Sequence, residues 1–472
     1  MEPDRDLIED LREAVGGDAL RSHRLDLAVF ARDAGVTAGT VVAAVLPSTT
    51  EEVAECVRIA LRHRVPIVPR GAGTGLAGGA VPARPGLLIV LTRLNAIHEV
   101  DEVARTAWVG PGLINLDLSE RLVDHGLHFA PDPSSQAAST IGGNLGTNAG
   151  GPHCLADGTT VAHILAAEMV TPEGDVITVG GAAPDTPGLD LRAVLVGSEG
   201  TIGIATRILV RLMQNSPDAT TILIGFSSIT DAAATVSAII ASGQIPAALE
   251  MMDQPMVEAV EKFVHAGYPT EAAAVLLAEV TGTPESVASA APSIEAIARE
   301  HRATSIRTAR DPEDRALLWK ARKAAFGAVA QKAPDYYLHD TVVPRTRLVE
   351  VLTRIYEIGS RYELDMLNVF HAGDGNLHPL VAFDSSEPGM LDKVRAAATE
   401  MVVASIEAGG SLSGEHGIGI EKRDLMGLVF DESDLDAQAR IRDAFDPDGV
   451  MNPGKVLPTG SRCFDAAGTG LP

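Results

Sequence analysis

The chain has 472 residues, enough for two or three domains, and its 46% hydrophobic and 21% charged residues are an ordinary globular balance. Its 38 basic and 63 acidic residues give a formal net charge of −25, which argues against nucleic acid as a partner and against an anionic membrane as the main target. The three cysteines lie far apart and form no CxxC pair, which predicts a reducing compartment without a disulfide framework.

Residues 1–6 are acidic and lack an apolar core, so we expect no signal peptide. No apolar run approaches the about 20 residues that span a bilayer. We therefore expect a cytoplasmic protein without a transmembrane segment, docked at most peripherally on a membrane. Apolar spacing predicts helices over residues 4–15 and 49–64, and residues 66–69 are expected to form a short buried strand.

Residues 71–79 directly follow this strand and include five glycines. Glycine lets the backbone turn sharply and bring N–H groups close to an anion, so a phosphate cradle is one interpretation and a flexible surface turn is the other. Gly73, Gly75 and Gly78 match the Gly-x-Gly-x-x-Gly spacing of dinucleotide sites, but that fingerprint must open a helix. Prolines and a predicted strand at 87–91 follow instead.

Further segments of the first half have the same character. Residues 131–135 (Pro-Asp-Pro-Ser-Ser) are turn-forming, and residues 140–151 contain five glycines and are expected not to form a regular helix. Residues 197–204 contain three more glycines. Several separated glycine-rich segments beside strands are more specific than any one of them. Together they predict a long, polar, phosphate-bearing cofactor laid across one domain.

The pattern changes near residues 215–217, where we expect a domain boundary. The segments that follow alternate between half-apolar strand and amphipathic helix, which predicts an antiparallel α+β domain with helices on one face. Residues 318–323 include Arg322, which is either a carboxylate clamp or part of the basic face of an exposed helix. In the strand predicted at 335–340, His339 is expected to be structural.

Two histidines flank the turn of a predicted hairpin. The apolar runs 366–370 and 380–383 enclose His371-Ala-Gly-Asp-Gly-Asn-Leu-His378, which predicts strand, tight turn, strand. Further on, Glu415 and His416 add a carboxylate and a third imidazole. Two His and one Glu beside another His suit a metal and a general base, whereas the His pair alone is more typical of a hydrogen-bonded turn.

These segments resemble the flavin-binding domain of the vanillyl-alcohol oxidase superfamily. Within it they are most similar to the branch of D-lactate dehydrogenases, D-2-hydroxyglutarate dehydrogenases and the flavin subunit of glycolate oxidase. The resemblance extends from about residue 49 to residue 458. It implies an α+β fold with a PCMH-type FAD-binding domain in 1–215, a cap domain with an antiparallel sheet in 216–440, a return to the FAD domain in 441–458, and a flexible tail in 459–472.

The resemblance implies that FAD is bound non-covalently, because Thr74 stands where covalent members have a histidine. A covalent role for His153 or Cys154 is the alternative. The residues expected by position to line FAD are Arg70, Gly71, Ala72, Gly73, Thr74, Gly75, Pro131, Asp132, Ser134, Ser135, Gly142, Gly143, Asn144, Thr147, Asn148, Gly150, Glu199, Gly203, Ile204 and Asn452.

For the active site the resemblance implies a divalent metal (zinc, manganese or iron) held by His371, His378 and Glu415. His416 would be the catalytic base, Arg322 would bind the substrate carboxylate, and Asn376 would support the substrate by hydrogen bonding. The implied reaction is the oxidation of a small D-2-hydroxy acid (D-lactate, glycolate or D-2-hydroxyglutarate) to the 2-oxo acid by hydride transfer to FAD.

The resemblance also implies an electron acceptor other than NAD: a quinone, a cytochrome, an electron-transfer flavoprotein or an iron–sulfur subunit. A homodimer is compatible with the sequence. Two alternatives are open. One is a non-redox synthase of the alkylglycerone-phosphate type, although that group has a run of histidines where this chain has Gly414-Glu415-His416. The other is a metallohydrolase that uses the His/His/Glu set.

Overall fold

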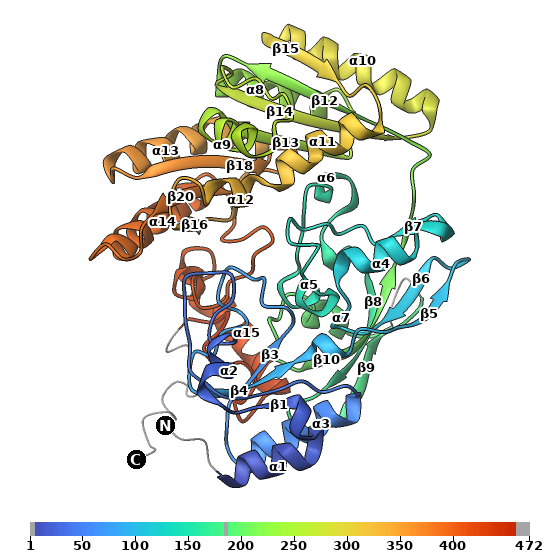
Figure 1. Ribbon diagram of the computed structural model, residues 1–472, viewed down its shortest axis with the longest axis vertical. Coiled ribbons are helices and arrows are strands. Elements are labelled where there is room, and N and C mark those ends of the chain that lie inside the picture. Colours follow the sequence, from blue (N-terminus) through green and yellow to red (C-terminus); the bar gives the residue numbers. More distant parts are fainter. Residues whose placement is uncertain (1–4, 184–186, 459–472) are drawn as a thin grey trace. The chain divides into compact units, whose positions relative to one another are not determined.

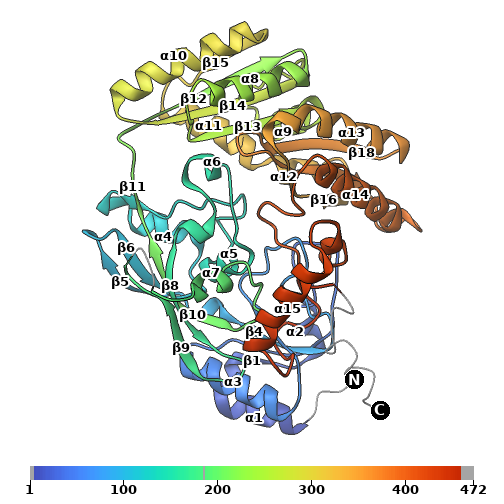
Figure 2. The same ribbon diagram turned by 180° about the vertical axis from the view of Figure 1, so that it is seen from behind.

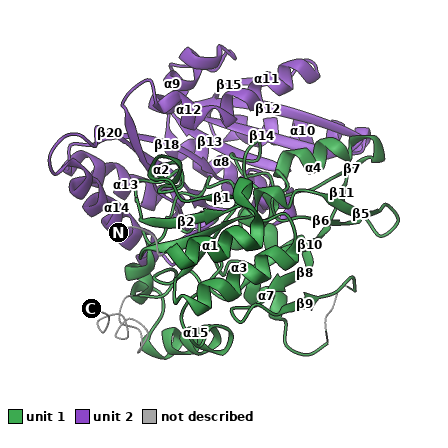
Figure 3. Ribbon diagram, turned by 60° about the horizontal axis from the view of Figure 1, so that its bottom comes forward, with its two compact units in different colours: residues 1–150, 159–215, 415–472 green, residues 151–158, 216–414 purple. Residues whose placement is uncertain are grey.

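The computed structural model describes residues 5–183 and 187–458 (Figure 1). The predicted tail at 459–472, which includes Cys463, lies outside the described residues. The chain forms two compact units (Figure 3). Unit 1 comprises residues 1–150, 159–215 and 415–472, and unit 2 comprises residues 151–158 and 216–414.

The first sheet of unit 1 is built from β1 (Leu20–Arg21), β2 (Val41–Val45), β3 (Ile67–Arg70) and β4 (Gly86–Val90), with helices α1 (Arg5–Val15), α2 (Arg24–Ala28) and α3 (Thr50–Arg62). The strand order is β1-β2-β4-β3, and β4 pairs in parallel with both β2 and β3. Helix α3 begins where the Thr49 hydroxyl accepts a hydrogen bond from the Glu52 amide, and its apolar face is buried against the sheet. The predicted helices and strand of this region are confirmed.

The second sheet of unit 1 has five antiparallel strands in the order β5-β6-β10-β8-β9: β5 (Ile97–Asp101), β6 (Thr106–Val109), β8 (Ile164–Val170), β9 (Val176–Gly180) and β10 (Ile204–Arg211). Helices α4 (Asn115–Arg121), α5 (Ile141–Thr147) and α7 (Leu191–Leu195) accompany it, and β7 (Leu127–His128) pairs with β11 (Met213–Gln214). Leu118, Ile141 and Leu195 from these helices are buried with the sheet in one hydrophobic cluster.

The prediction that residues 140–151 form no regular helix was wrong, because α5 spans residues 141–147. The Thr140 side chain caps the helix by accepting from the Gly143 amide at 3.2 Å. Ile141 and Leu145 are buried on one face, and each such burial contributes about 1.5–3 kcal/mol, which exceeds the about 1 kcal/mol that one helical glycine costs. The helix ends at Asn148, which has the left-handed φ of 52°.

The carboxy-terminal part of unit 1, coloured red in Figure 2, carries α15 (Glu432–Phe445). A capping box between Asp431 and Asp434 fixes its start. After α15 the chain runs beside β3: the Ile67 amide donates to Val450 O at 2.8 Å, and the Asn452 amide donates to Ile67 O at 2.7 Å. Asn452 is thereby tied to the strand that leads into the first glycine-rich loop.

Unit 2 is organised around one nine-stranded sheet in which every pairing is antiparallel. The order is β15-β12-β14-β13-β18-β19-β17, and β20 lies between β18 and β16. The strands are β12 (Asp218–Phe226), β13 (Ala248–Asp253), β14 (Ala274–Gly282), β15 (Ala303–Thr308), β16 (Asp335–Leu338), β17 (Thr341–Val342), β18 (Asp365–His371), β19 (Asn376–Leu377) and β20 (Pro379–Phe383).

Helices cover both faces of this sheet, so the prediction of helices on one face was wrong. On one face lie α8 (Ile229–Ala241), α10 (Pro284–Glu300), α13 (Leu348–Arg361) and α14 (Met390–Glu407). On the other lie α9 (Gln254–Val264), α11 (Pro312–Lys323) and α12 (Ala325–Val329). The physical reason is that both sides of the central strands are apolar: neighbouring residues Leu276 and Leu277 of β14 are buried in different hydrophobic clusters.

The short helix α6 (Cys154–Asp157) belongs to unit 2, where Leu155 packs into the hydrophobic cluster of the first face. Among the described helices, none combines the length and the apolarity that a membrane span needs.

Candidate cofactor and active site

The three glycine-rich segments and the predicted Asn452 converge within unit 1. A side chain at Gly71 would place its Cβ 2.3 Å from Thr140 Oγ1, so the backbone of the first loop lies close to the side chain that caps α5. A Cβ at Gly79 would lie 2.9 Å from Glu199 Oε2, which joins the first and third segments. The Asn452 amide group donates to both Gly79 O (2.9 Å) and Glu199 O (2.6 Å). Segments far apart in sequence thus form one glycine-lined region.

Arg70 shapes the first loop. Its guanidinium is buried and donates from Nη2 to Arg32 O at 2.8 Å and from Nη1 to Ala80 O at 3.3 Å. Gly73 has a φ of 76°, and a Cβ there would overlap this guanidinium. Burial lowers the pKa of Arg70, opposed by the charge of Asp33. Arg70 therefore supports the loop. The direct contact of Arg70 with FAD that the resemblance implies stays a prediction.

Buried polar atoms around these segments are suited to a polar ligand. Among the described residues, Ser139 Oγ, Asn144 Nδ2 and Ser198 Oγ are buried and have no hydrogen-bond partner. Buried polar groups normally have partners, so these three atoms fit a ligand rich in hydrogen-bonding groups, as FAD is. The Pro131 carbonyl accepts a hydrogen bond from Asn115 Nδ2 at 2.8 Å, which holds the turn-forming segment 131–135 at its start.

Other predicted FAD residues have structural roles inside the same region. Asn148 Oδ1 accepts from the Val161 amide at 2.8 Å. The Glu199 carboxylate accepts from the Ile418 and Gly419 amides, and burial nevertheless raises its pKa. Lys455, which sequence reasoning missed, is fully buried and donates to Val81 O and Asn452 Oδ1. Burial lowers the pKa of this amine to about 8.

In unit 2 the predicted hairpin is confirmed and brings its two histidines together. β18 pairs with β19 and β20, and the ring centroids of His371 and His378 are 5.1 Å apart at an interplanar angle of 89°. Both rings are buried. His371 Nδ1 is bonded to Glu250 at 2.8 Å, and His378 Nδ1 lies 3.3 Å from His339 O. In each ring Nδ1 faces a protein acceptor, which is the usual outer contact of a metal-ligating histidine and makes Nε2 the ligand atom.

Glu250 is the most important side chain that the sequence did not reveal. It is 1% exposed, and its carboxylate contacts both His371 and Arg322, whose Nη2 lies 2.5 Å from Glu250 Oε2. Burial alone would raise the pKa of Glu250, but the charges of His371 and Arg322 outweigh it and lower this pKa. The available signal was a carboxylate in the middle of the otherwise apolar segment 248–252.

Arg322 is 1% exposed, so the alternative of an exposed basic helix face is wrong. Among the described residues, none of its three guanidinium nitrogens has a partner with hydrogen-bond geometry, and Nη2 lies at ion-pair distance from Glu250. An ionised group this deep in the protein is costly unless paired, and Glu250 pairs only one of the three guanidinium nitrogens. The remaining donors fit a second carboxylate, such as that of a substrate.

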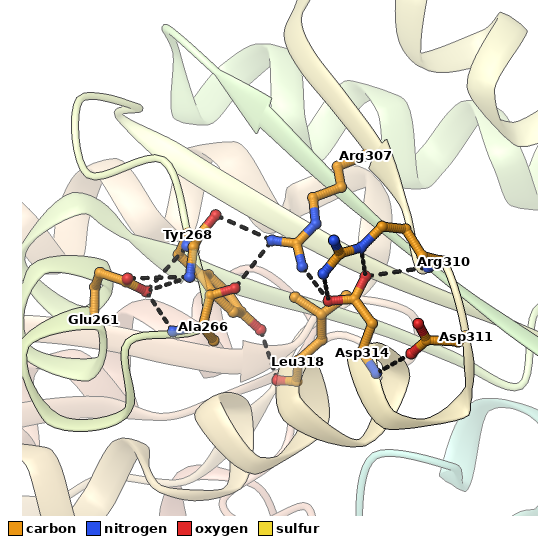
Figure 4. Close-up of polar contacts among 9 residues, drawn as sticks. Glu261, Ala266, Tyr268, Arg307, Arg310, Asp311, Asp314 and Leu318 are labelled. Atoms are coloured by element: carbon orange, nitrogen blue, oxygen red, sulfur yellow. Dashed lines mark hydrogen bonds and ion pairs between the residues drawn. The ribbon is translucent and has the colours of Figure 1, made fainter.

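A polar network holds the helix that carries Arg322 (Figure 4). Asp314, in the first turn of α11, accepts hydrogen bonds from Arg307 and from the Arg310 amide. Tyr268 Oη donates to Leu318 O at 2.9 Å, one helical turn before Arg322. Tyr268 is itself held in place, because the backbone amides of residues 266–268 donate to the Glu261 carboxylate. The position of Arg322 is therefore fixed by contacts that lie away from the ligand-binding groups.

The other predicted active-site residues lie near the end of unit 2 or directly after it. Asn376 is 4% exposed, and among the described residues its Oδ1 has no hydrogen-bond partner. A Cβ on Gly414 would lie 2.5 Å from the Asn376 side chain, and the Gly414 amide donates to the buried Asp340 at 3.0 Å. Asp340 was missed in the sequence. Glu415 directly follows Gly414 in the sequence, and its Oε1 lies 3.7 Å from His416 Nε2.

His153, weighed as a covalent FAD site, has a different contact in unit 2. Its Nε2 lies 3.3 Å from Glu279 Oε1, and its ring stacks on Trp319 with centroids 5.5 Å apart.

Comparisons with known proteins place this architecture in a family. Residues 41–180 match the model of the "FAD binding domain", and residues 216–456 match that of the "FAD linked oxidases, C-terminal domain". The chain is 44% identical to glycolate oxidase subunit GlcD of Escherichia coli K12 over 421 residues, which cover 89% of this chain and 84% of that one. It is 32% identical to a D-lactate dehydrogenase of Anaerostipes hadrus over 418 residues, which cover 87% and 88%.

The chain belongs to the FAD-linked oxidases of the vanillyl-alcohol oxidase superfamily and is an FAD-dependent oxidoreductase. The fold is the predicted PCMH-type α+β fold: a p-cresol methylhydroxylase structure superposes with a TM-score of 0.83 at 17% identity over 97% of this chain and 98% of the other. A 4-ethylphenol oxidase from Gulosibacter chungangensis gives 0.79 at 19% identity over 98% and 100%.

Proposed function

We propose that this flavoenzyme oxidises a small D-2-hydroxy acid, of the glycolate, D-lactate or D-2-hydroxyglutarate class, to the 2-oxo acid and uses a divalent metal to do so. The observation that supports it most is the buried set of His371, Glu250 and Arg322 beside His378. Two imidazoles oriented through Nδ1 suit a metal, and a buried guanidinium with unused donors suits an acid.

The cofactors supply the two capacities that side chains lack: bound FAD accepts a hydride, and a bound divalent metal lowers the pKa of the substrate hydroxyl. In this chain His371, His378 and Glu415 are the proposed metal ligands. Arg322 holds the substrate carboxylate through Nε and Nη1, and the Asn376 amide supports the substrate by hydrogen bonding. These contacts orient the reacting carbon, which is what a transfer in near-attack geometry requires.

His416 is the proposed base that takes the hydroxyl proton. An imidazole is neutral near pH 7 at its ordinary pKa and can therefore accept a proton there. Its side chain is 14% exposed, so it is neither sealed from solvent nor fully hydrated.

Electrons then leave to an acceptor other than NAD, of the quinone, cytochrome, electron-transfer flavoprotein or iron–sulfur type. The name of the relatives as a "subunit" of glycolate oxidase supports a complex with other chains. The cytoplasmic location and peripheral membrane docking stay predictions from the sequence.

The test is a panel of glycolate, D-lactate, L-lactate and D-2-hydroxyglutarate with an artificial dye as acceptor. At least one of the D-acids or glycolate is expected to bleach the flavin anaerobically and to reduce the dye in turnover, and L-lactate is expected to be a much poorer substrate. A flavin that none of these acids reduces, in protein loaded with FAD and metal, would contradict the proposed reaction.

A further inference from the structure

We propose that Glu250 is a positioning residue shared by both halves of the active site: one carboxylate fixes the ring of His371 as a metal ligand and holds the guanidinium of Arg322 as a carboxylate clamp. The inference rests on the proposed function, because it gives Glu250 a role in that same reaction.

The sheet register places Glu250 where it must meet His371. The two residues are directly opposite each other in the β13–β18 pairing, although they are 121 residues apart in the sequence. His371 Nδ1 lies 2.8 and 2.9 Å from the two carboxylate oxygens. A carboxylate at Nδ1 keeps the proton on that nitrogen, so Nε2 carries the lone pair that binds a metal. The strand pairing thus sets both the tautomer and the direction of the ring.

The same carboxylate reaches the opposite side of the site through α11. Arg322 Nη2 lies 2.5 Å from Glu250 Oε2, and both side chains are 1% exposed. This ion pair holds one end of the guanidinium near Glu250, and all three of its nitrogens have hydrogen-bonding capacity left among the described residues, with Nε and Nη1 unpaired for a second acceptor. A guanidinium held in place loses less conformational entropy when the substrate binds.

The charge of Glu250 also matters. A histidine that binds a metal must be neutral, so in the metal-bound site the negative carboxylate and the positive guanidinium cancel, and the pair adds orientation without adding net charge. Neutralising Glu250 would leave an unbalanced buried cation beside the position of a metal dication, and like charges repel strongly at low dielectric. A neutral acceptor makes a weaker hydrogen bond to His371 Nδ1, and this weaker bond and the unbalanced charge both weaken metal binding.

A second buried glutamate of unit 2, Glu279, provides a matched control for the role assigned to Glu250. Glu279 lies on the neighbouring strand β14, is also 1% exposed, and binds an arginine of α11 and a histidine: Arg315 at 2.8 Å and His153 at 3.3 Å. It also accepts from Thr221 Oγ1 at 2.7 Å. None of these partners is a proposed ligand or substrate contact. Glu250 and Glu279 are therefore two buried carboxylates with similar partners, of which only one touches the proposed site.

The experiment compares Glu250→Gln with Glu279→Gln. Affinity for Mn²⁺ and Zn²⁺ is measured on FAD-loaded protein without substrate, by competition with a chromophoric chelator at fixed pH, and KM is measured with the best acid of the panel. Loss of an outer contact to a metal ligand typically weakens binding about 10–100-fold, which is the expectation for Glu250→Gln together with a raised KM. Glu279→Gln is expected to stay within about twofold of wild type in metal affinity. Equal metal affinities in the two variants would overturn the assignment.

A second pair of variants keeps the test decisive if Glu250→Gln does not fold. Glu250→Met with Arg322→Met removes both charges and leaves no lone buried ion, a replacement that proteins often tolerate. The double variant is expected to lose metal affinity, whereas Arg322→Met alone keeps or strengthens it, because His371 retains its partner and the Glu250 charge is no longer balanced, and it raises KM. Equal metal affinity in the single and double variants would contradict the inference. A wild-type protein that binds no divalent metal would instead contradict the proposed function.

Discussion

Two regions of this molecule are built by different means. The glycine-rich region of unit 1 is built around closely approached backbone: Gly71 lies against the Thr140 hydroxyl, Gly79 lies against the Glu199 carboxylate, and the Asn452 side chain donates to two backbone carbonyl groups. The charged cluster of unit 2 is assembled from side chains, with Glu250 between His371 and Arg322. A long polar cofactor is matched by closely approaching backbone, whereas a small reacting acid needs a few charges in fixed directions.

The comparison predicts that metal-dependent oxidation can be lost without loss of FAD binding, and metal removal is expected to have the largest effect. Chelation is expected to abolish oxidation of the 2-hydroxy acid, because the hydroxyl is a poor acid without the metal. FAD is expected to stay bound, since its predicted contacts are in the glycine-rich segments of unit 1. Dye reduction and the flavin absorption spectrum are recorded before and after dialysis against the chelator. Full turnover in protein shown by elemental analysis to be metal-free would remove the metal from the mechanism.

His416→Ala is expected to lower kcat by about 10²–10⁴, the usual contribution of a positioned base, while the bound-flavin spectrum is unchanged. Single-turnover flavin reduction in a stopped-flow instrument measures the step directly. His301→Ala, at the carboxy-terminal cap of α10 and outside the proposed machinery, serves as a control that should keep wild-type turnover. Near-normal reduction in His416→Ala would mean that another group takes the proton.

Glu279→Gln tests whether the second buried carboxylate of unit 2 is purely structural. Hydrogen bonds and the charges of Arg315 and His153 overcome the burial that would raise its pKa and lower it to about 2. A folded pKa below the unfolded value means stability that is complete above about pH 4.5 and lost as pH falls toward about 2, on the order of 3 kcal/mol.

The variant is therefore expected to be less stable than wild type by this order at pH 7, with the difference shrinking below about pH 4.5. Urea unfolding at pH 7, 5 and 4 measures it. A difference that stays constant across this range, or grows toward acid pH, would contradict the ionised state assigned to Glu279.

Gly71→Ala probes the backbone-built region and has the smallest expected effect. Its Cβ would lie 2.3 Å from Thr140 Oγ1, so either the hydroxyl that caps α5 or the loop must shift. Overpacking of this kind costs about 1–3 kcal/mol, and FAD affinity is expected to fall about tenfold or more while metal affinity is kept. Gly181→Ala is the matched control, because nothing lies within 4 Å of its added Cβ. Flavin fluorescence titration of the apoprotein compares the two, and equal FAD affinities would show that this close approach does not shape the cofactor site.

The sequence revealed the backbone-built region more readily than the charged one, for a physical reason. Glycine runs such as 140–151 are local, so their composition alone indicates close backbone approach. Glu250 and His371 meet only because β13 and β18 pair, and no local pattern carries that information. The hairpin with its two histidines was predictable because both strands and the turn lie within one short segment.

Two predictions failed where tertiary contacts overrode local preference. The helix α5 forms despite its glycines, because Thr140 caps it and Ile141 and Leu145 are buried. The covering of both sheet faces was not recognised, although the nearly unbroken apolar run Ala274–Ala278 in β14 was a signal for it. Arg322 was ambiguous for the same reason: only packing decides whether an arginine on a helix faces solvent or a buried carboxylate.

The membership of residues 151–158 in unit 2 has a practical consequence for dissecting the protein. A polypeptide of residues 216–414 alone would lack His153, a partner of Glu279, and Leu155, which fills space against Gly373. Unit 2 is thus made of two separate segments of the sequence. Isolating it requires joining the eight-residue segment 151–158 to the main segment through a designed linker. Limited proteolysis or expression of simple fragments is expected to yield an incompletely packed sheet domain, which makes the intact chain the proper object for measuring metal and acid binding.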